Sequence, residues 1–141
     1  MRKIKIPLED DPQGYEAEWL WASRRLRGYS IENSPFSAYG LSFRDIVSAE
    51  NKGGELVFKS ILEKRGHRTI RIKLPVGKVH RDFMLLWPQL EAVGCTFEGS
   101  QTNGPLYAVD VPPTVDKDTV LRILWENENK GNWEFEEVDF Y

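Results

Sequence analysis

The stretch that decides the fold is residues 67–74, which read HRTIRIKL. Its aliphatic side chains fall on one face of an extended chain, namely Ile70, Ile72 and Leu74. Its polar side chains fall on the other face, namely His67, Thr69, Arg71 and Lys73. A period of two residues is typical of a β-strand with one face in the core and the other in water. We therefore expect a strand with one buried and one solvent-exposed face.

Two helices are expected after this strand. Residues 81–93 carry apolar side chains three or four positions apart, as an amphipathic helix does. Pro88 lies inside this segment and should kink the helix or divide it, because its ring removes a backbone donor. A second helix is expected from Thr114 to about Glu128, with acidic residues at its positive end.

Three further strands alternate with these helices. They are expected at 95–98, 106–111 and 133–140, with a hairpin loop at 100–105 between the first two. In the last strand the apolar side chains change face, which predicts a bulge near Glu136.

The segment before residue 67 predicts short strands only, at 3–6, 16–26, 29–32, 44–49 and 56–63. The second of these could continue a helical period as well, but its tryptophans favour a strand. Gly53 and Gly54 supply the backbone freedom of a tight hairpin before the last strand. Several aromatic residues of this segment are expected to fill the core or the junction between lobes, namely Trp19, Trp21, Tyr29, Phe36, Tyr39 and Phe43.

Together these elements predict an α+β protein. Residues 1–66 are expected to form a small antiparallel β-barrel-like lobe, and residues 67–141 a ferredoxin-like βαββαβ lobe. The strand at 67–74 is expected to be shared by the two lobes and to join them into one compact unit. A chain of 141 residues is long enough to bury a core without disulfides.

Charge and cysteine content limit the class of protein. Cys95 is the single cysteine, so no intramolecular disulfide can form, and we expect a soluble, cytoplasmic protein without a membrane segment. The net charge is only −3, but residues 59–81 are strongly basic and residues 126–141 strongly acidic. We expect two separate surfaces of opposite charge.

No catalytic or metal-binding pattern stands out. Cys95 follows a predicted helix end and is expected to be a buried thiol, which argues against a cysteine nucleophile served by His67 or His80. These residues also lack the short paired spacings of a zinc site. Glu98 and Asp110 fall on neighbouring strands, but any acidic protein offers such pairs. We therefore predict no enzymatic activity, no metal and no cofactor.

Two surfaces are candidates for binding. A basic face is the candidate anion site, formed by Lys59, His67, Thr69, Arg71 and Lys73. The C-terminal segment mixes aromatic and acidic side chains, as a protein-binding surface does, and its candidate residues are Trp133, Glu134, Glu136, Glu137, Asp139 and Tyr141. The alternatives are a solvated sheet face for the first set and a final strand that closes the core for the second.

The chain resembles a family of small, uncharacterised bacterial proteins classed as a domain of unknown function. The resemblance is carried by LWA at 20–22, NSPF at 33–36, GHRTIR at 66–71, GC at 94–95 and DVP at 110–112. It implies a bacterial origin and a two-lobed body, and it assigns no activity. It draws attention to Gly66, His67, Thr69 and Arg71 without giving them a role.

Three hypotheses about function follow. The first is a non-enzymatic bacterial protein that binds a protein partner, for example an immunity-type protein that neutralises a toxin. The second is a regulator that binds RNA, a nucleotide or another phosphorylated ligand on the basic face at 59–81; the absence of interleaved aromatic side chains there weakens this case. The third is an enzyme with His67 as general base, which would need a deep pocket and an orienting carboxylate. The sequence leaves the oligomeric state open.

Overall fold

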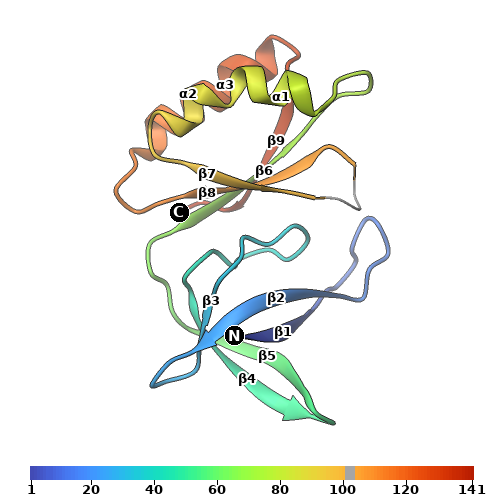
Figure 1. Ribbon diagram of the computed structural model, residues 1–141, viewed down its shortest axis with the longest axis vertical. Helices are drawn as coiled ribbons and strands as arrows, with labels where there is room; N and C mark the ends of the chain where they lie inside the picture. The colour runs from blue at the N-terminus through green and yellow to red at the C-terminus, as the bar shows by residue number, and fades with distance from the viewer. Residues whose placement is uncertain (101–103) are drawn as a thin grey trace.

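The structure, a computed structural model, describes residues 1–100 and 104–141. It shows an all-β half below and a half with helices above, with the C-terminus at their junction (Figure 1). The mixed α+β class is confirmed. The predicted hairpin loop at 100–105 includes residues 101–103, which lie outside the described residues.

The N-terminal half is a closed barrel of five strands, and the expected barrel is therefore confirmed. The strands are β1 Arg2–Pro7, β2 Ala17–Arg24, β3 Tyr29–Ile31, β4 Ile46–Lys52 and β5 Glu55–Glu63. Consecutive strands pair antiparallel, but β1 and β5 close the barrel as a parallel pair with Ile4 opposite Leu56. The consecutive strands are antiparallel as expected, and the closing pair is parallel because in a meander of five strands the first and the last run in the same direction.

The C-terminal half is a four-stranded sheet with the order β7-β8-β6-β9. Its strands are β6 Arg68–Lys73, β7 Thr96–Gly99, β8 Leu106–Val111 and β9 Glu134–Asp139. All its pairs are antiparallel. The register between β6 and β9 shifts between Thr69 and Ile70, opposite the 137–139 segment, so the predicted bulge exists one or two residues beyond Glu136.

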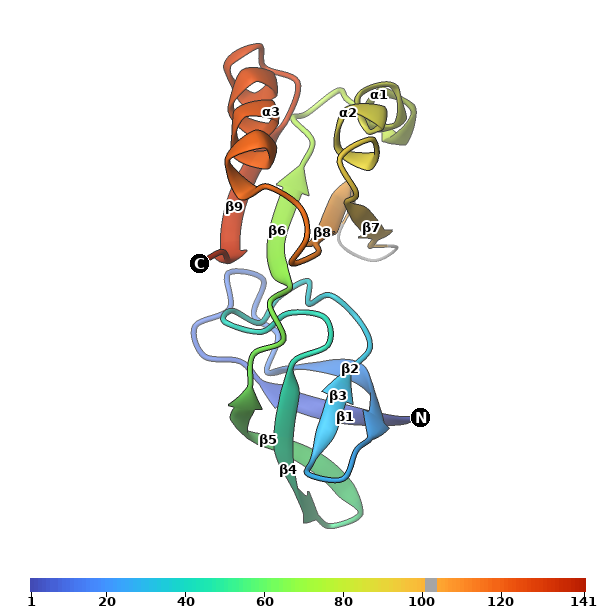
Figure 2. The ribbon, with the colours of Figure 1, turned by 90° about the vertical axis from the view of Figure 1, so that its left-hand side faces the viewer.

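Helices cover one face of this sheet (Figure 2). They are α1 His80–Leu86, α2 Pro88–Glu91 and α3 Lys117–Asn129. Pro88 is the first residue of α2, so it divides the predicted helix into two short pieces. Asp116 caps α3 by accepting from the backbone N–H of Thr119.

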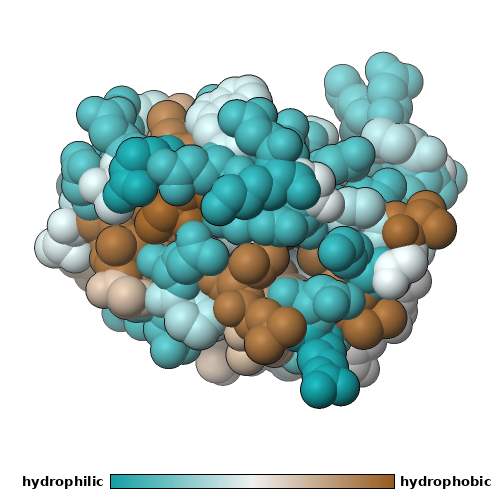
Figure 3. Space-filling view, turned by 90° about the horizontal axis from the view of Figure 1, so that it is seen from above, coloured by the Kyte–Doolittle hydropathy of each residue, from teal (hydrophilic) through white to brown (hydrophobic). Residues whose placement is uncertain are grey.

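Each half has its own hydrophobic core. The core of the upper half lies between the sheet and the helices and includes Ile70, Ile72, Phe83, Leu124 and Trp133. The barrel core includes Ile4, Leu20, Ile31, Leu41 and Val47. The helical end of the molecule shows hydrophobic side chains broken up by hydrophilic ones (Figure 3).

The two halves meet through the short connection between β5 and β6 and through the long loop between β3 and β4. Strand β5 ends at Glu63 and β6 begins at Arg68, and β6 pairs only with β8 and β9. The prediction that this strand is shared by both sheets was therefore wrong: the barrel closes without it. Gly66 in the connection has a φ of +91°, and a Cβ there would lie 2.9 Å from the Cβ of Pro113. Glycine is needed at position 66 because of the positive φ and because there is no room for a Cβ next to Pro113.

Candidate functional site

Arg71 is buried between the two halves, with its side chain 3% exposed. Its Nε donates to the carboxylate of Glu136 at 3.0 Å. Its two terminal nitrogens donate to the backbone carbonyls of Pro35, Ser37 and Ala38. These residues belong to the loop between β3 and β4, which we call the barrel-half loop. The ring of Tyr39 lies 4.6 Å from the guanidinium carbon. The guanidinium is thus occupied by protein groups and ties the loop to the sheet.

The polar face of β6 is therefore not the exposed surface that its alternation predicts. The two faces are as predicted, but Thr69 and Arg71 on the polar one are buried, and only Lys73 is exposed. The reason is that the loop between β3 and β4 packs on this face. Lys59 does not join these residues, because it lies on β5 in the barrel and pairs with Glu50 at 3.1 Å.

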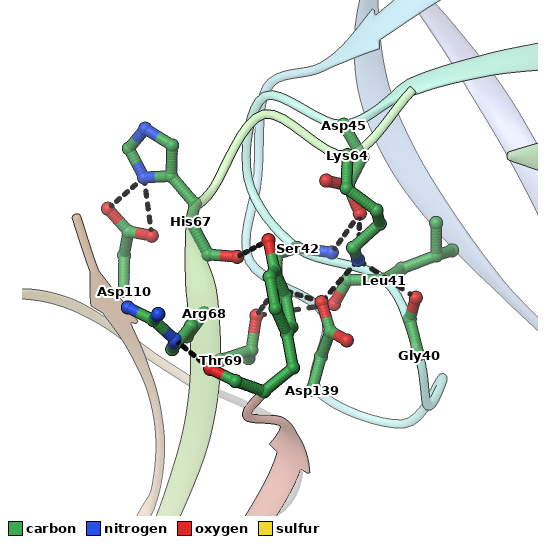
Figure 4. Close-up of polar contacts among 11 residues, drawn as sticks. Gly40, Leu41, Ser42, Asp45, Lys64, His67, Arg68, Thr69, Asp110 and Asp139 are labelled. Atoms are coloured by element: carbon green, nitrogen blue, oxygen red, sulfur yellow. Dashed lines mark hydrogen bonds and ion pairs between the residues drawn. The ribbon is translucent and has the colours of Figure 1, made fainter. Parts of the chain in front are cut away.

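A second buried cluster surrounds Lys64, in the connection between the halves. Figure 4 shows its ammonium between the carboxylates of Asp45 and Asp139 and the carbonyl oxygen of Gly40. The Asp139 carboxylate also accepts from the hydroxyl of Ser42 at 2.6 Å, which lies 2.6 Å from the hydroxyl of Thr69. One lysine thus joins the barrel half to the last strand of the sheet.

The charges of Lys64, Asp45 and Asp139 contact one another, but burial removes Asp45 and Lys64 from part of their water. Burial raises the pKa of Asp45, and the hydrogen bond from Lys64 offsets part of that rise. Burial alone would lower the pKa of Lys64, but its hydrogen bonds and charge contacts with Asp139 and Asp45 outweigh burial and raise it. Asp45 Oδ2 also accepts from the N–H of Ser42 at 2.9 Å. Its other oxygen, Oδ1, has no partner among the described residues.

His67 has the carboxylate that a general base would need. Its Nδ1 lies 2.9 and 3.0 Å from the two oxygens of Asp110 (Figure 4). Phe43 packs edge-on against the imidazole ring. Burial raises the pKa of Asp110. His67 and Asp110 do not line the two hollows of the cleft at Arg71 and Lys73. Asp110 therefore orients the imidazole of His67, but the imidazole does not line that cleft.

Cys95 is buried, as predicted, with 3% exposure. Burial, and then the negative charge of Asp110, raises the pKa of its thiol to about 12. A thiol with such a pKa remains protonated at neutral pH and is a poor nucleophile.

Two glutamates that the sequence did not mark as anchors also hold the barrel-half loop. Glu18 accepts from the backbone N–H groups of residues 36–38 at 2.6 to 3.0 Å. Glu98 of β7 accepts from the side chain of Asn33 and the backbone N–H of Ser34. Glu98 is therefore a structural anchor across the junction. No local pattern reveals these contacts, because the partners lie far apart in the sequence.

A cleft opens where the loops of the barrel half meet the sheet. It comprises two adjoining hollows of about 240 and 210 Å³ that share Arg71, Lys73, Leu106 and Glu136. Glu134 lines the first hollow and Asp11 the second. Since Lys73 is the exposed cation here and acids surround it, the cleft does not offer a net positive site for an anion.

The C-terminal candidate residues do not form one surface. Trp133 is 1% exposed and its indole N–H donates to the carbonyl of Leu124, so its prediction as an exposed binding residue was wrong. Glu136 and Asp139 are tied to Arg71 and Lys64. Tyr141 is 48% exposed, and its hydroxyl donates to the carbonyl of His67.

Glu134 and Glu137 are exposed, as is Glu136. Glu134 and Glu137 lie on opposite faces of β9, because Glu134 pairs with Lys73 and Glu137 with Ile70. The acidic segment is therefore divided between the cleft and the side of the sheet that carries α3.

The charged regions are also not two separate poles. Basic residues of the connection and β6 bind groups of the C-terminal segment: Lys64 binds Asp139, Arg68 donates to the carbonyl oxygen of Tyr141, and Arg71 binds Glu136. The expected charge separation was wrong because β6 and β9 are neighbours in the sheet.

Trp125 is an exposed aromatic residue that the sequence reasoning missed. It is 52% exposed on α3 and packs edge-to-face on Phe135 of β9, with ring centroids 5.1 Å apart. Glu128 lies beside them and accepts from the N–H of Phe135 at 3.3 Å. The helical period could have revealed it, because the buried positions of α3 are Val120, Ile123, Leu124 and Asn127.

Trp19 and Trp21 do not fill the core. They are 44% and 43% exposed on the outside of the barrel, whereas Leu20 and Ala22 point inward. The expectation that they are core or junction residues was wrong. The alternation of β2 is regular, but its small and aliphatic residues take the inside.

The fold and this junction define an α+β protein made of a closed five-stranded barrel and a helix-covered, four-stranded antiparallel sheet. Residues 18–135 match the model of a domain of unknown function, DUF4265, and the chain belongs to that family. This confirms the resemblance to an uncharacterised family.

The same architecture occurs in a solved structure. A hypothetical protein from Neisseria gonorrhoeae is similar over 98% of this chain and 94% of its own, with a TM-score of 0.81 and 20% sequence identity. At this identity the likeness shows the fold alone. No protein with a curated description matches the chain.

Within the described ranges, 1–100 and 104–141, no helix is long and apolar enough to cross a membrane. The same ranges contain no group of three or more His, Cys, Asp or Glu residues placed to hold a metal ion.

Proposed function

We propose that this chain is a non-enzymatic binding protein that takes a protein partner along the open edge of β9. The observation that carries the proposal is the exposed Trp125, packed on the half-buried Phe135, beside the acidic residues Glu128 and Glu137. Aromatic anchors with a polar rim are the usual centre of a protein interface. We name this set of four residues the α3–β9 surface.

The position of β9 supports the same proposal. It is the last strand in the order β7-β8-β6-β9, so its outer edge is not paired with another strand of the sheet, although Glu128 accepts from the N–H of Phe135 and the N–H of Gly40 donates to the carbonyl of Val138. A partner strand can add to such an edge through backbone hydrogen bonds, and side-chain pockets then give specificity. Acidic side chains along the edge hinder pairing with another copy of the same chain and favour a basic partner.

A finer assignment rests on the same argument. We propose an immunity-type role, in which the acidic surface covers a basic region of a toxin, in the cytoplasm, where a single free cysteine is stable. We further propose a boundary near Gly66 between a barrel lobe and a ferredoxin-like lobe. The antiparallel order β9-β6-β8-β7 and the βαββαβ succession support that name.

The alternative role, an anion-binding regulator on the basic face at 59–81, has less support. Three bases of that region are engaged by acids: Lys59 by Glu50, Lys64 by Asp45 and Asp139, and Arg71 by Glu136, whereas Lys73 is exposed. A ligand that uses the first three would have to displace these contacts.

The experiment that tests the proposal measures binding to the protein encoded next to this one in its genome, by titration calorimetry. We expect Trp125→Ala to raise the Kd at least tenfold and Glu137→Lys to raise it several-fold, with a weaker salt dependence. Glu63→Lys, a charge reversal on the exposed end of β5, is the matched control and should bind as the wild type does. Equal affinity of all four proteins would refute the α3–β9 surface as the binding site.

A further inference from the structure

The outside of the barrel carries a ladder of two tryptophans and two lysines. In the register of β1 and β2, Lys3 lies opposite Trp21 and Lys5 opposite Trp19. The ammonium of Lys3 is 5.0 Å from the ring centroid of Trp21, and that of Lys5 is 5.8 Å from that of Trp19. Both indoles are more than two-fifths exposed. We call these four residues the Trp–Lys ladder.

The ladder is a surface and not an incomplete core. Ile4, Ile6, Leu20 and Ala22 on the same two strands already fill the barrel, each with at most 4% exposure. The two indoles therefore add large aromatic areas to a face that the described residues do not cover. Indoles spaced two apart on one strand stand side by side, about 7 Å apart along the chain.

We propose that the Trp–Lys ladder binds single-stranded nucleic acid, with bases stacked on the two indoles and the lysines on the phosphates. Flat aromatic rings beside cations are the elements of such sites, and stacking tolerates any base because every base has a π-face. The ladder offers indole faces and ammonium groups that already lie over them. A base replaces the ammonium over the ring, and the freed lysine then reaches the phosphate backbone.

The ion pair between Lys5 and Glu55 argues against insertion into a lipid bilayer. Insertion would bury this pair, whose charged atoms are 3.5 Å apart, together with the flanking backbone of mid-strand residues. A nucleic acid strand lies on the surface and leaves the Glu55 carboxylate in water, while Lys5 exchanges that carboxylate for a phosphate. The proposal concerns a face remote in sequence and fold from the α3–β9 surface, and it goes beyond the proposed function.

The expected site is small, which makes its salt dependence diagnostic. Two lysines neutralise about two phosphates, so the logarithm of the affinity should fall with the logarithm of the salt concentration with a slope of about −1.4. Binding that depends on stacking should also prefer single strands to duplex, because the bases of a duplex are already stacked.

The test is fluorescence anisotropy of a labelled 12-nucleotide oligouridylate with the full chain at low salt. We expect the wild type to bind, Trp19→Ala/Trp21→Ala to lose at least tenfold in affinity, and Lys3→Ala/Lys5→Ala to lose affinity and reduce the salt slope. Trp125→Ala is the matched control, since this tryptophan is 52% exposed on the other half, and it should bind normally. Trp19→Phe/Trp21→Phe should retain part of the binding because it keeps aromatic faces.

Several results would overturn the proposal. They are the absence of wild-type binding at low salt, equal losses in Trp125→Ala and the double tryptophan variant, and equal affinity for a duplex of the same length. Binding to vesicles of phosphatidylserine and phosphatidylcholine that requires Trp19 and Trp21, without binding to the oligonucleotide, would assign the face to a membrane instead. Since Trp125 tests one surface and the Trp–Lys ladder the other, failure here is distinguishable from failure of the protein-binding proposal.

Discussion

Strands β2 and β6 make an instructive pair, because both alternate cleanly, yet β6 buries its polar face as well as its aliphatic one while β2 leaves its tryptophan face open. In β6 the face with Thr69 and Arg71 is covered by the barrel-half loop. In β2 the face with Trp19 and Trp21 is open. A period of two residues fixes which side chains share a face, but tertiary packing decides which face is covered.

The covered face of β6 and the open face of β2 should differ most in how much stability is lost when their charged or aromatic side chains are removed. On β6, Arg71→Ala deletes four hydrogen bonds and leaves the carbonyls of Pro35 and Ala38 without their donor. We expect a loss of about 3–5 kcal/mol in the free energy of unfolding, because a buried ionic network is broken on one side. Urea denaturation followed by circular dichroism measures it.

The matched control for this change is Lys73→Ala, two residues along the same strand and on the same face but exposed. It should change the free energy of unfolding by no more than about 0.5 kcal/mol. If the two substitutions have equal and small effects, the junction does not depend on Arg71 and the contrast between the strands is lost.

The second prediction concerns Lys64, which joins the halves through carboxylates. Lys64→Met removes the cation from Asp45, whose side chain is fully buried, and we expect a loss of about 2 kcal/mol. Since the pKa of Lys64 is raised above its ordinary value of 10.5, its stabilising effect should be complete at and below that pH and lost only as the pH rises through the folded-state pKa. The difference between wild type and variant should accordingly be constant from pH 7 to 9.

A double variant separates the ion pair from the alkyl chain. Adding Asp45→Asn to Lys64→Met removes the uncompensated carboxylate, so the double variant should be more stable than Lys64→Met alone. The exposed neighbour Arg65→Met, whose partner Glu63 is also exposed, should have almost no effect. If Asp45→Asn makes Lys64→Met less stable still, the buried carboxylate is not the source of the loss.

The sequence predicted the elements well because their signals are local. The period of residues 67–74, the division of the helix at Pro88 and the face change in the last strand all follow from the residues concerned. The barrel was also predictable, because short strands with tight turns have few ways to avoid open edges.

The candidate site was predicted only in part, because it depends on packing between distant segments. The loop from Asn33 to Asp45 has no regular period, so nothing in it indicates that it covers β6. The register of β9 against β6, which brings Glu136 to Arg71, is a long-range feature and was not readable either. For this reason the sequence did not reveal that Arg71, a residue of the predicted anion site, is engaged by protein groups, whereas Trp125 could have been found from the helical period of α3.

The smallest effect is expected on the open face of β2. Trp19→Ser/Trp21→Ser should lower the free energy of unfolding by no more than about 1 kcal/mol per site, since the lost cation–π contacts are exposed. Leu20→Ala, between the two tryptophans but 2% exposed, should cost about 2–5 kcal/mol and is the control on the same strand. Both are measured by urea denaturation. A double tryptophan variant as unstable as Leu20→Ala would mean that the indoles hold the barrel together, and then their exposure would no longer indicate a binding surface.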